Sequence, residues 1–222
     1  MNQTIAIDGP AGAGKSTIAK LAAKELGYIY VDTGALYRAI GLAASRRGYT
    51  ADDKAEVVAM LGEIRVALAF NDKGEQIVLL DGEDVSGFIR TPEISMMASA
   101  VSAIPEVRAF LLDLQRDMAH TNNVIMDGRD IGTVVLPDAQ LKIFLSASPE
   151  CRARRRYDEL IEKGMDVKYE DILSDVIARD YADSHREIAP LKPAEGAVIV
   201  DTSGEDLETS VNKLLAIMKE NI

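Results

Sequence analysis

The sequence predicts an α/β protein in which helices flank a five-stranded parallel sheet, and three observations predict it. Five short apolar runs, rich in Ile and Val, lie at residues 4–8, 28–32, 123–127, 141–146 and 197–201. Helical segments separate these runs, which is typical of parallel strands joined by crossover helices. A glycine-rich segment, GPAGAGKST, follows the first run directly. The third observation is one stretch, residues 64–89, that alternates between apolar and polar residues and contains turn residues.

Composition predicts one domain that acts on small molecules. The 222 residues are enough for a full core, and 47% hydrophobic with 27% charged residues is a globular balance. The net charge of −11 disfavours a nucleic-acid partner, although arginines can still gather locally. No apolar run reaches the roughly 18 residues of a membrane span, and we see no signal peptide. The single cysteine, Cys151, fits a reducing compartment. We therefore expect a cytoplasmic protein. No helix carries a long apolar seam, so we expect a monomer.

The first helix is expected over residues 15–26, with Gly27 as its stop signal. Its buried face should be formed by Ile18, Leu21, Ala22 and Leu26.

The stretch 64–89 predicts an antiparallel hairpin or three-stranded unit, with turns at 71–74 and 81–82. Helices are expected on either side, at about 52–63 and 92–120, and Pro105 should divide the second of them. We therefore expect an inserted lobe over about residues 35–120. The core would then comprise about 1–34 and 121–222, with a short lid at about 150–170.

The glycine-rich segment matches the phosphate-binding pattern G-x-x-x-x-G-K-[ST]. Glycines let backbone N–H groups approach phosphate oxygens, and the helix that begins there adds its positive end. The lysine can reach the β and γ phosphates, and the serine can ligate Mg²⁺. We expect all nine residues to bind ATP: Gly9, Pro10, Ala11, Gly12, Ala13, Gly14, Lys15, Ser16 and Thr17.

Asp127 ends the third core run and is a second candidate for the Mg²⁺ site, through a water molecule. A strand-end turn residue is the alternative interpretation. The guanine-reading N-K-x-D of switch GTPases does not occur in the sequence.

The segment VDTGALYR predicts that residues near a strand end meet a second substrate. Thr33 should cap a helix, and Tyr37 and Arg38 could hold a flat ring and a phosphate. Core packing for Tyr37 and a solvated charge for Arg38 remain open alternatives.

A basic cluster, CRARRR, begins the helix that follows the fourth run. Positive charge near a helix N-terminus opposes the helix dipole, which indicates a role other than helix stability. A mobile lid that clamps phosphates is one interpretation, a solvated face is another, and a nucleic-acid patch is disfavoured by the acidic chain. The residues concerned are Arg152, Arg154, Arg155 and Arg156.

The segment RDYADSHR spaces Arg179, Asp183 and Arg186 four and three residues apart, which places them on one helical face. Arginines there could bind a phosphate while the aspartate takes sugar hydroxyls, although surface ion pairing is the alternative. The two histidines, His120 and His185, are expected at the surface, and a zinc site is disfavoured.

Together these features predict a kinase for a phosphorylated acceptor. Phosphoryl transfer depends on positioning and on charge stabilisation by Lys, Arg and Mg²⁺. An acceptor phosphate brings its own nucleophilic oxygen, so no general base is required.

The chain also resembles bacterial cytidylate kinases, from about residue 4 to residue 201. The segments that carry the resemblance are GPAGAGKST, DTGALYR, GEDVSGFIRTPEI, DGRDIGTVVLPDA and RDYADSHREIAPL. The resemblance implies a P-loop kinase core with an inserted acceptor-binding lobe and a short arginine-rich lid. It implies that ATP and Mg²⁺ phosphorylate CMP and dCMP. A UMP kinase and a nucleotide-binding switch are the alternatives.

The resemblance also implies roles for individual residues. Three residues would read the cytosine ring, and a carboxylate suits its 4-amino donor: Ser99, Arg108 and Asp130. Others would line the rest of the CMP site: Thr33, Tyr37, Arg38, Arg129, Arg179, Asp183 and Arg186. The expected catalytic residues are Lys15, Arg129, Arg155 and Arg186. Two departures are Thr33, where many members have Ser, and GKST, where some have GKGT; the second leaves the Mg²⁺ contact of Ser16 open.

Overall fold

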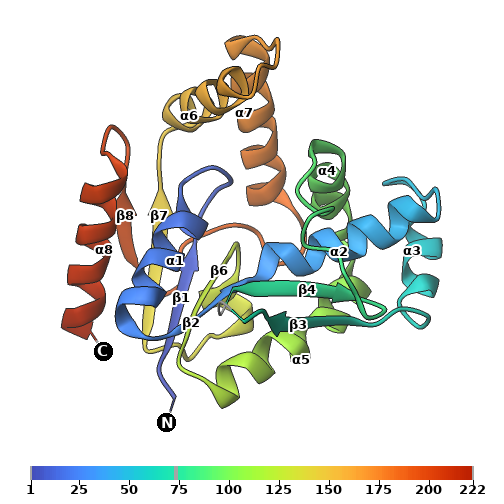
Figure 1. Ribbon diagram of the computed structural model, residues 1–222, viewed down its shortest axis with the longest axis horizontal. Helices are drawn as coiled ribbons and strands as arrows, with labels where there is room; N and C mark the ends of the chain where they lie inside the picture. Colours follow the sequence, from blue (N-terminus) through green and yellow to red (C-terminus); the bar gives the residue numbers. More distant parts are fainter. Residues whose placement is uncertain (1, 73–74, 222) are drawn as a thin grey trace. The chain divides into compact units, whose positions relative to one another are not determined.

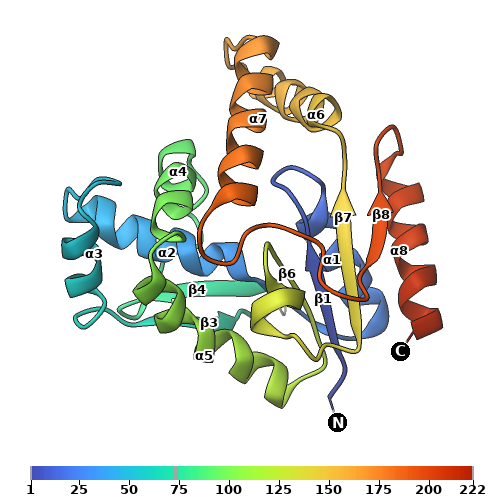
Figure 2. The same cartoon turned by 180° about the vertical axis from the view of Figure 1, so that it is seen from behind.

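The computed structural model describes residues 2–72 and 75–221 and divides the chain into two compact units. One unit comprises residues 1–30 and 122–222, and the other comprises residues 31–121. Figures 1 and 2 show the elements of both units from opposite sides. Each unit has its own hydrophobic cluster, so each is described by itself.

The larger unit is built on a five-stranded sheet of order β2-β6-β1-β7-β8. The strands are β1 (Thr4–Asp8), β2 (Ile29–Asp32), β6 (Val124–Gly128), β7 (Leu141–Ser146) and β8 (Val198–Asp201). The last two residues of β2 are counted with the smaller unit. The pairings of β1 with β6, β1 with β7 and β7 with β8 are parallel. In the first of these Asp8 is level with Gly128, so the carboxyl ends of the two strands meet at one edge. The predicted parallel sheet is confirmed.

Helices α1 (Lys15–Leu26) and α8 (Leu207–Asn221) pack on this sheet through one apolar cluster that includes Ile18, Ala22 and Leu214. The predicted bounds of α1 are confirmed, but its buried face differs from the prediction, since Leu21 is 43% exposed. Helices α6 (Pro149–Glu162) and α7 (Tyr169–His185) form a separate pair (Figure 1), with Ala153, Leu160 and Ile172 between them.

The sequence did not predict the short π-helical turn Ile131–Val135, which follows β6.

The smaller unit combines four helices with an antiparallel three-stranded sheet of order β3-β4-β5. The strands are β3 (Val66–Phe70), β4 (Gln76–Leu80) and β5 (Glu83–Asp84). The helices are α2 (Thr33–Arg46), α3 (Lys54–Met60), α4 (Pro92–Val101) and α5 (Pro105–Thr121). The predicted three-stranded unit and the break at Pro105 are confirmed. Of the predicted turn at 71–74, residues 73 and 74 lie outside the described residues.

One predicted cap in this unit is wrong by one residue. Asp32, not Thr33, precedes α2, and its Oδ1 accepts a hydrogen bond of 3.0 Å from Ala35 N. A carboxylate in this position satisfies an otherwise unpaired helix N–H and interacts favourably with the helix dipole.

Among the described residues no single helix is long and apolar enough to span a membrane. The pair α4 and α5 meets the length and composition criteria only when both helices are counted together, and a bend of 99° separates them.

Candidate active site

The glycine-rich loop connects β1 to α1 and requires glycine at its first position. Gly9 has φ of 149°, and a Cβ there would lie 1.9 Å from the carbonyl oxygen of Leu145. No side chain fits such a distance, so the loop passes directly over the backbone of β7. Gly14 precedes the first residue of α1, which turns the helix N-terminus and its unpaired N–H groups toward the loop. The predicted strand–loop–helix context of the motif is confirmed.

Lys15 lies against this loop, with only 5% of its surface exposed. Its Nζ donates a hydrogen bond of 2.8 Å to the carbonyl oxygen of Pro10. Burial, and after it the positive charge of Arg129, lowers the pKa of Lys15 to about 7, although the nearby carboxylates of Asp127, Asp8 and Asp183 act in the opposite direction. A phosphate group beside Nζ would favour the charged form, so binding of a polyphosphate and protonation of Lys15 reinforce each other.

Ser16 and Asp127 face each other, as a joint metal role requires. Ser16 Oγ donates to Asp127 Oδ2 at 2.8 Å, and Tyr30 Oη donates to Oδ1 at 3.0 Å. Asp127 is 3% exposed. Within residues 2–72 and 75–221 no three His, Cys, Asp or Glu side chains gather as a metal cage. A hydroxyl and one carboxylate nevertheless fit Mg²⁺, which usually takes few protein ligands beside substrate phosphates.

The end of β6 and the end of α7 are joined by two ion pairs. Arg129 Nε lies 2.9 Å from Asp183 Oδ2, and Arg186 Nη2 lies 3.5 Å from Asp130 Oδ1. The side chains of Asp183, Asp130 and Arg186 are at most 9% exposed. The structure therefore brings four of the predicted acceptor residues together. Asp183 and Arg186 are therefore paired below the surface, with Arg129 22% exposed, which disfavours for these two residues the surface ion pairing that the spacing left open.

The predicted single helical face holds only in part. Arg179 and Asp183 lie on α7, but the helix ends at His185, and Arg186 follows it with extended backbone angles. Both histidines are exposed, as predicted.

The arginines of α6 have different partners, so the structure does not hold them as one group. Arg152 is 3% exposed and forms a bidentate ion pair with Asp180 of α7. The same guanidinium donates to the carbonyl oxygens of Ala11, at 3.0 Å, and Ala147, at 2.8 Å. Arg152 therefore links the glycine-rich loop to α7. A guanidinium with five donors suits such a role, because each acceptor lies in a different direction.

The other three arginines of the run diverge. Arg154 lies over the rings of Tyr157 and Tyr169, and Arg156 pairs with Glu159 at the surface. Arg155 Nη2 donates to Thr202 O at 2.9 Å, and a Cβ on Gly14 would lie 4.0 Å from its Nη1. Among these three arginines Arg155 lies beside the loop, and its hydrogen bonds run to the backbone carbonyl oxygens of Thr202 and Glu205 rather than to a carboxylate.

In the smaller unit Asp32 holds two arginines. Its Oδ2 lies 2.7 Å from Arg38 Nη2 and 3.3 Å from Arg90 Nη2. The side chain of Arg38 is 20% exposed, and its buried Nε has no hydrogen-bond partner among the described residues. A fixed guanidinium with an unused donor is suited to an anionic ligand. This geometry disfavours the alternative of a solvated charge for Arg38.

Two further predicted residues of this unit lie together. The guanidinium of Arg108 lies 5.8 Å from the ring centroid of Tyr37, and Arg108 is 9% exposed. Thr33 is buried at the start of α2, whereas Ser99 is half-buried on α4. Tyr37 also packs against the apolar cluster of this unit, so the packing role left open by the sequence is real.

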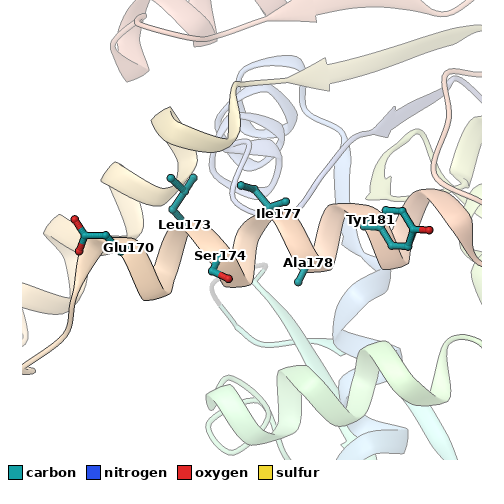
Figure 3. A pocket seen from close by; sticks show the side chains of 6 residues that line it. All are labelled: Glu170, Leu173, Ser174, Ile177, Ala178 and Tyr181. Atoms are coloured by element: carbon teal, nitrogen blue, oxygen red, sulfur yellow. The ribbon is translucent and has the colours of Figure 1, made fainter.

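In the larger unit a hollow of about 610 Å³ lies along α7 (Figure 3). Figure 3 shows that all its lining side chains project from that helix: Glu170, Leu173, Ser174, Ile177, Ala178 and Tyr181. The lining contains one acidic and no basic side chain. It is therefore unsuited to a phosphate-bearing ligand.

Sequence reasoning missed four residues that organise the site: Asp8, Tyr30, Asp32 and Asp180. Two of them could have been found from the sequence, because Asp8 and Asp32 are each an acidic residue at the end of an apolar run. Tyr30 and Asp180 carry no local signal, because their partners lie 97 and 28 residues away in the chain.

Comparison with known sequences identifies the family of this chain. The family profile described as Cytidylate kinase matches residues 5–220. The chain belongs to the cytidylate kinase family. This confirms the resemblance drawn from the motifs, and it makes the chain a kinase. A cytidylate kinase from Caldanaerobacter subterraneus subsp. tengcongensis is 52% identical over 217 residues, which cover 98% of this chain and 95% of that protein. A cytidylate kinase from Caldicellulosiruptor bescii is 51% identical over 213 residues, which cover 96% of this chain and 94% of that protein.

Among solved structures, this cytidylate kinase family member shares its fold with an uncharacterized protein from Eubacterium ventriosum. The TM-score is 0.52 at 10% identity, with 98% of this chain and 99% of the other covered.

Proposed function

We propose that this chain transfers the γ-phosphoryl group of ATP to CMP and dCMP, giving ADP and CDP or dCDP. The observation that carries the proposal is its membership of the cytidylate kinase family over nearly the whole chain. The buried Lys15 against the glycine-rich loop supports a polyphosphate donor. The paired arginines and aspartates at the ends of β6 and α7 support an acceptor that carries both a phosphate and polar ring groups.

On the donor side, backbone N–H groups of residues 9–17 would bind the ATP phosphates. Lys15 would neutralise charge on the β and γ phosphates, and Arg155 would stabilise the transferring group. These roles need no covalent chemistry, because positioning and charge supply most of the catalysis in phosphoryl transfer.

Ser16 and Asp127 would hold Mg²⁺, the serine directly and the aspartate through water. When bound, Mg²⁺ would supply positive charge that offsets the negative charge of the transferring phosphates. Tyr30 would then orient Asp127 by its hydrogen bond of 3.0 Å to Oδ1.

On the acceptor side, the arginines would hold the CMP phosphate and keep its attacking oxygen in line. Arg129, Arg186 and Arg38 would take this role. Arg179 and Asp183 would contact the pentose, with Thr33 and Tyr37 lining the same site. Asp130, with Ser99 and Arg108, would read the ring, because a carboxylate accepts from the 4-amino group of cytosine and repels the carbonyl oxygen of uracil.

The chain organisation follows from these roles. Residues of about 1–34 and 121–222 would form the ATP-binding core, those of about 35–120 the acceptor-binding insertion, and those of about 150–170 the lid. We propose a cytoplasmic monomer that needs no nucleic-acid or membrane partner.

The first test is ADP release from Mg·ATP with CMP, dCMP, UMP, AMP, GMP and shikimate as acceptors. We expect turnover with CMP and dCMP above all others, and loss of turnover in Lys15→Ala. Faster turnover with UMP would overturn the proposed ring-reading residues but keep the donor site. Binding of ATP without turnover on any acceptor would indicate a nucleotide-binding module instead.

Asp130→Asn tests base reading directly. We expect the ratio of kcat/KM for CMP over UMP to fall roughly tenfold or more, because an amide can present either a donor or an acceptor to the ring. The KM for ATP should stay within about twofold. Asp138→Asn, the same change at an exposed residue eight positions away, is the matched control. An unchanged ratio in Asp130→Asn removes this residue from base reading.

A further inference from the structure

Asp8 is an acidic side chain in the core of the larger unit, and none of the substrate or metal roles proposed above uses it. It ends β1, immediately before the glycine-rich loop, and is 2% exposed. A buried carboxylate is costly unless its oxygens are satisfied, so its partners indicate what it does.

Both carboxylate oxygens of Asp8 bind consecutive backbone amides of a distant segment. Oδ1 accepts from Ile131 N at 2.7 Å, and Oδ2 accepts from Gly132 N at 2.8 Å. These are the first two residues of the π-helical turn Ile131–Val135, whose leading N–H groups have no partner within the turn. Asp8 therefore caps this turn from the neighbouring strand.

The cap comes from Asp8 although Asp130 occupies the capping position itself. The side chain of Asp130 makes no capping hydrogen bond, and its carboxylate lies toward Arg186 instead. The adjacent Arg129 is paired with Asp183. By supplying the cap, Asp8 leaves the two preceding side chains directed at the site where α7 ends.

The segment has little room to adopt another position. A Cβ on Gly132 would lie 3.1 Å from Ala194 Cβ, 3.3 Å from Lys142 Cγ and 3.4 Å from Asp8 Oδ2. The backbone at Gly132 is thus enclosed on several sides, and the carboxylate of Asp8 forms one of them.

We propose that Asp8 is a positioning residue for the acceptor site: its carboxylate fixes the backbone at Ile131 and Gly132 and thereby sets the directions of the Arg129 and Asp130 side chains. This inference rests on the acceptor roles of Arg129 and Asp130 proposed above. The competing explanation is electrostatic, since the negative charge of Asp8 also acts on Lys15.

Asp8→Asn separates the two explanations, because the amide nitrogen cannot accept from a backbone N–H. One of the two anchoring hydrogen bonds is lost, and we expect the KM for CMP to rise roughly tenfold. The CMP over UMP ratio of kcat/KM should fall, while the KM for ATP stays within about twofold. Hydrogen exchange of the backbone amides in 129–135 should accelerate without any ligand. Asp138→Asn, at an exposed residue beyond the turn, should leave all four quantities unchanged.

A rise in the KM for ATP as large as that for CMP overturns the inference in favour of the electrostatic explanation. Faster exchange in 129–135 with unchanged CMP kinetics overturns it as well. If Asp130→Asn alters the CMP over UMP ratio but Asp8→Asn does not, only this inference fails. If neither variant alters the ratio, the proposed base reading fails with it.

If Asp8→Asn does not fold, Gly132→Ala tests the same positioning role. The added methyl group displaces the same backbone and leaves the charge of Asp8 in place. We expect the same selective increase in the KM for CMP. Unchanged CMP kinetics in Gly132→Ala, with faster exchange in 129–135, would contradict the positioning role.

Discussion

The carboxyl group of Asp8 shows that a single residue in this site is placed at a cost in stability. Burial raises its pKa from 3.8 to about 6, although the amides of Gly132 and Ile131 lower it and Lys15 also does so. Asp8 is therefore charged at neutral pH inside the protein, where burying an apolar side chain would cost less free energy. Residues that break a local rule in this way commonly belong to functional sites.

This shift predicts how stability depends on pH. The native pKa is above the unfolded value, so between about pH 4 and pH 6 the native state binds more protons than the unfolded state. Stability contributed by Asp8 therefore decreases as the pH rises through this window. The shift from 3.8 to about 6 corresponds to a loss on the order of 3 kcal/mol by pH 7.

Denaturant unfolding of the native chain and Asp8→Asn, from pH 4 to pH 7, measures this effect. The variant lacks the titrating group, so it does not lose this stability as the pH rises. The unfolding free energy of Asp8→Asn minus that of the native chain should therefore increase from pH 4 to pH 7. The corresponding difference for Asp138→Asn, at an exposed residue, should stay nearly constant. If the difference in unfolding free energy between Asp8→Asn and the native chain is the same from pH 4 to pH 7, the raised pKa of Asp8 is wrong.

At the scale of elements, the sequence predicts those helices and strands whose ends are determined by residues close to them in the chain. The strands at 4–8 and 141–146 and the helix at 15–26 have the expected bounds, because apolar runs, the glycine-rich loop and Gly27 delimit them. The break at Pro105 follows from the chemistry of proline in the same way. The phosphate-binding loop was recognisable for a similar reason, since all its residues are contiguous.

The role of Arg152 was not predictable, because it depends on an acid 28 residues further along the chain. In the sequence it is one of four arginines in a basic run, and such runs usually face solvent. The π-helical turn at 131–135 was missed because its cap comes from another strand. Contacts of this kind join segments far apart in sequence, and no local propensity encodes them.

Arg152 links the glycine-rich loop to α7, whereas Arg156 of the same helix lies at the surface. We therefore predict that replacing Arg152 lowers the unfolding free energy far more than replacing Arg156. Arg152→Met leaves Asp180 and the carbonyl oxygen of Ala11 without their buried partner, and should cost about 2–4 kcal/mol of unfolding free energy. It should also raise the KM for ATP, since Ala11 belongs to the glycine-rich loop. Arg156→Met is the matched control: its ion pair with Glu159 is 43% and 46% exposed and should contribute less than about 1 kcal/mol.

Unfolding by denaturant and steady-state kinetics of both variants test this prediction. Equal losses of stability in Arg152→Met and Arg156→Met would show that the bidentate pair is no stronger than a surface contact.

At the scale of the whole molecule, the chain consists of two units with separate hydrophobic clusters. The proposed donor residues belong to residues 1–30 and 122–222, whereas Thr33, Tyr37, Arg38, Ser99 and Arg108 belong to residues 31–121. A kinase must bring both substrates together and exclude water, because water would otherwise accept the phosphoryl group. Two units with independent cores satisfy this requirement when each can move as a body.

We therefore predict that binding of both substrates makes the molecule more compact. Small-angle scattering with CMP and a non-hydrolysable ATP analogue should give a smaller radius of gyration than scattering of the protein alone. The value should approach about 17 Å, which is expected for a compact chain of 222 residues. Lys15→Ala, in which the analogue binds weakly, should show a smaller change at the same concentrations. Identical profiles with and without both nucleotides, at concentrations shown to saturate the protein, would rule out closure as the means by which this kinase excludes water.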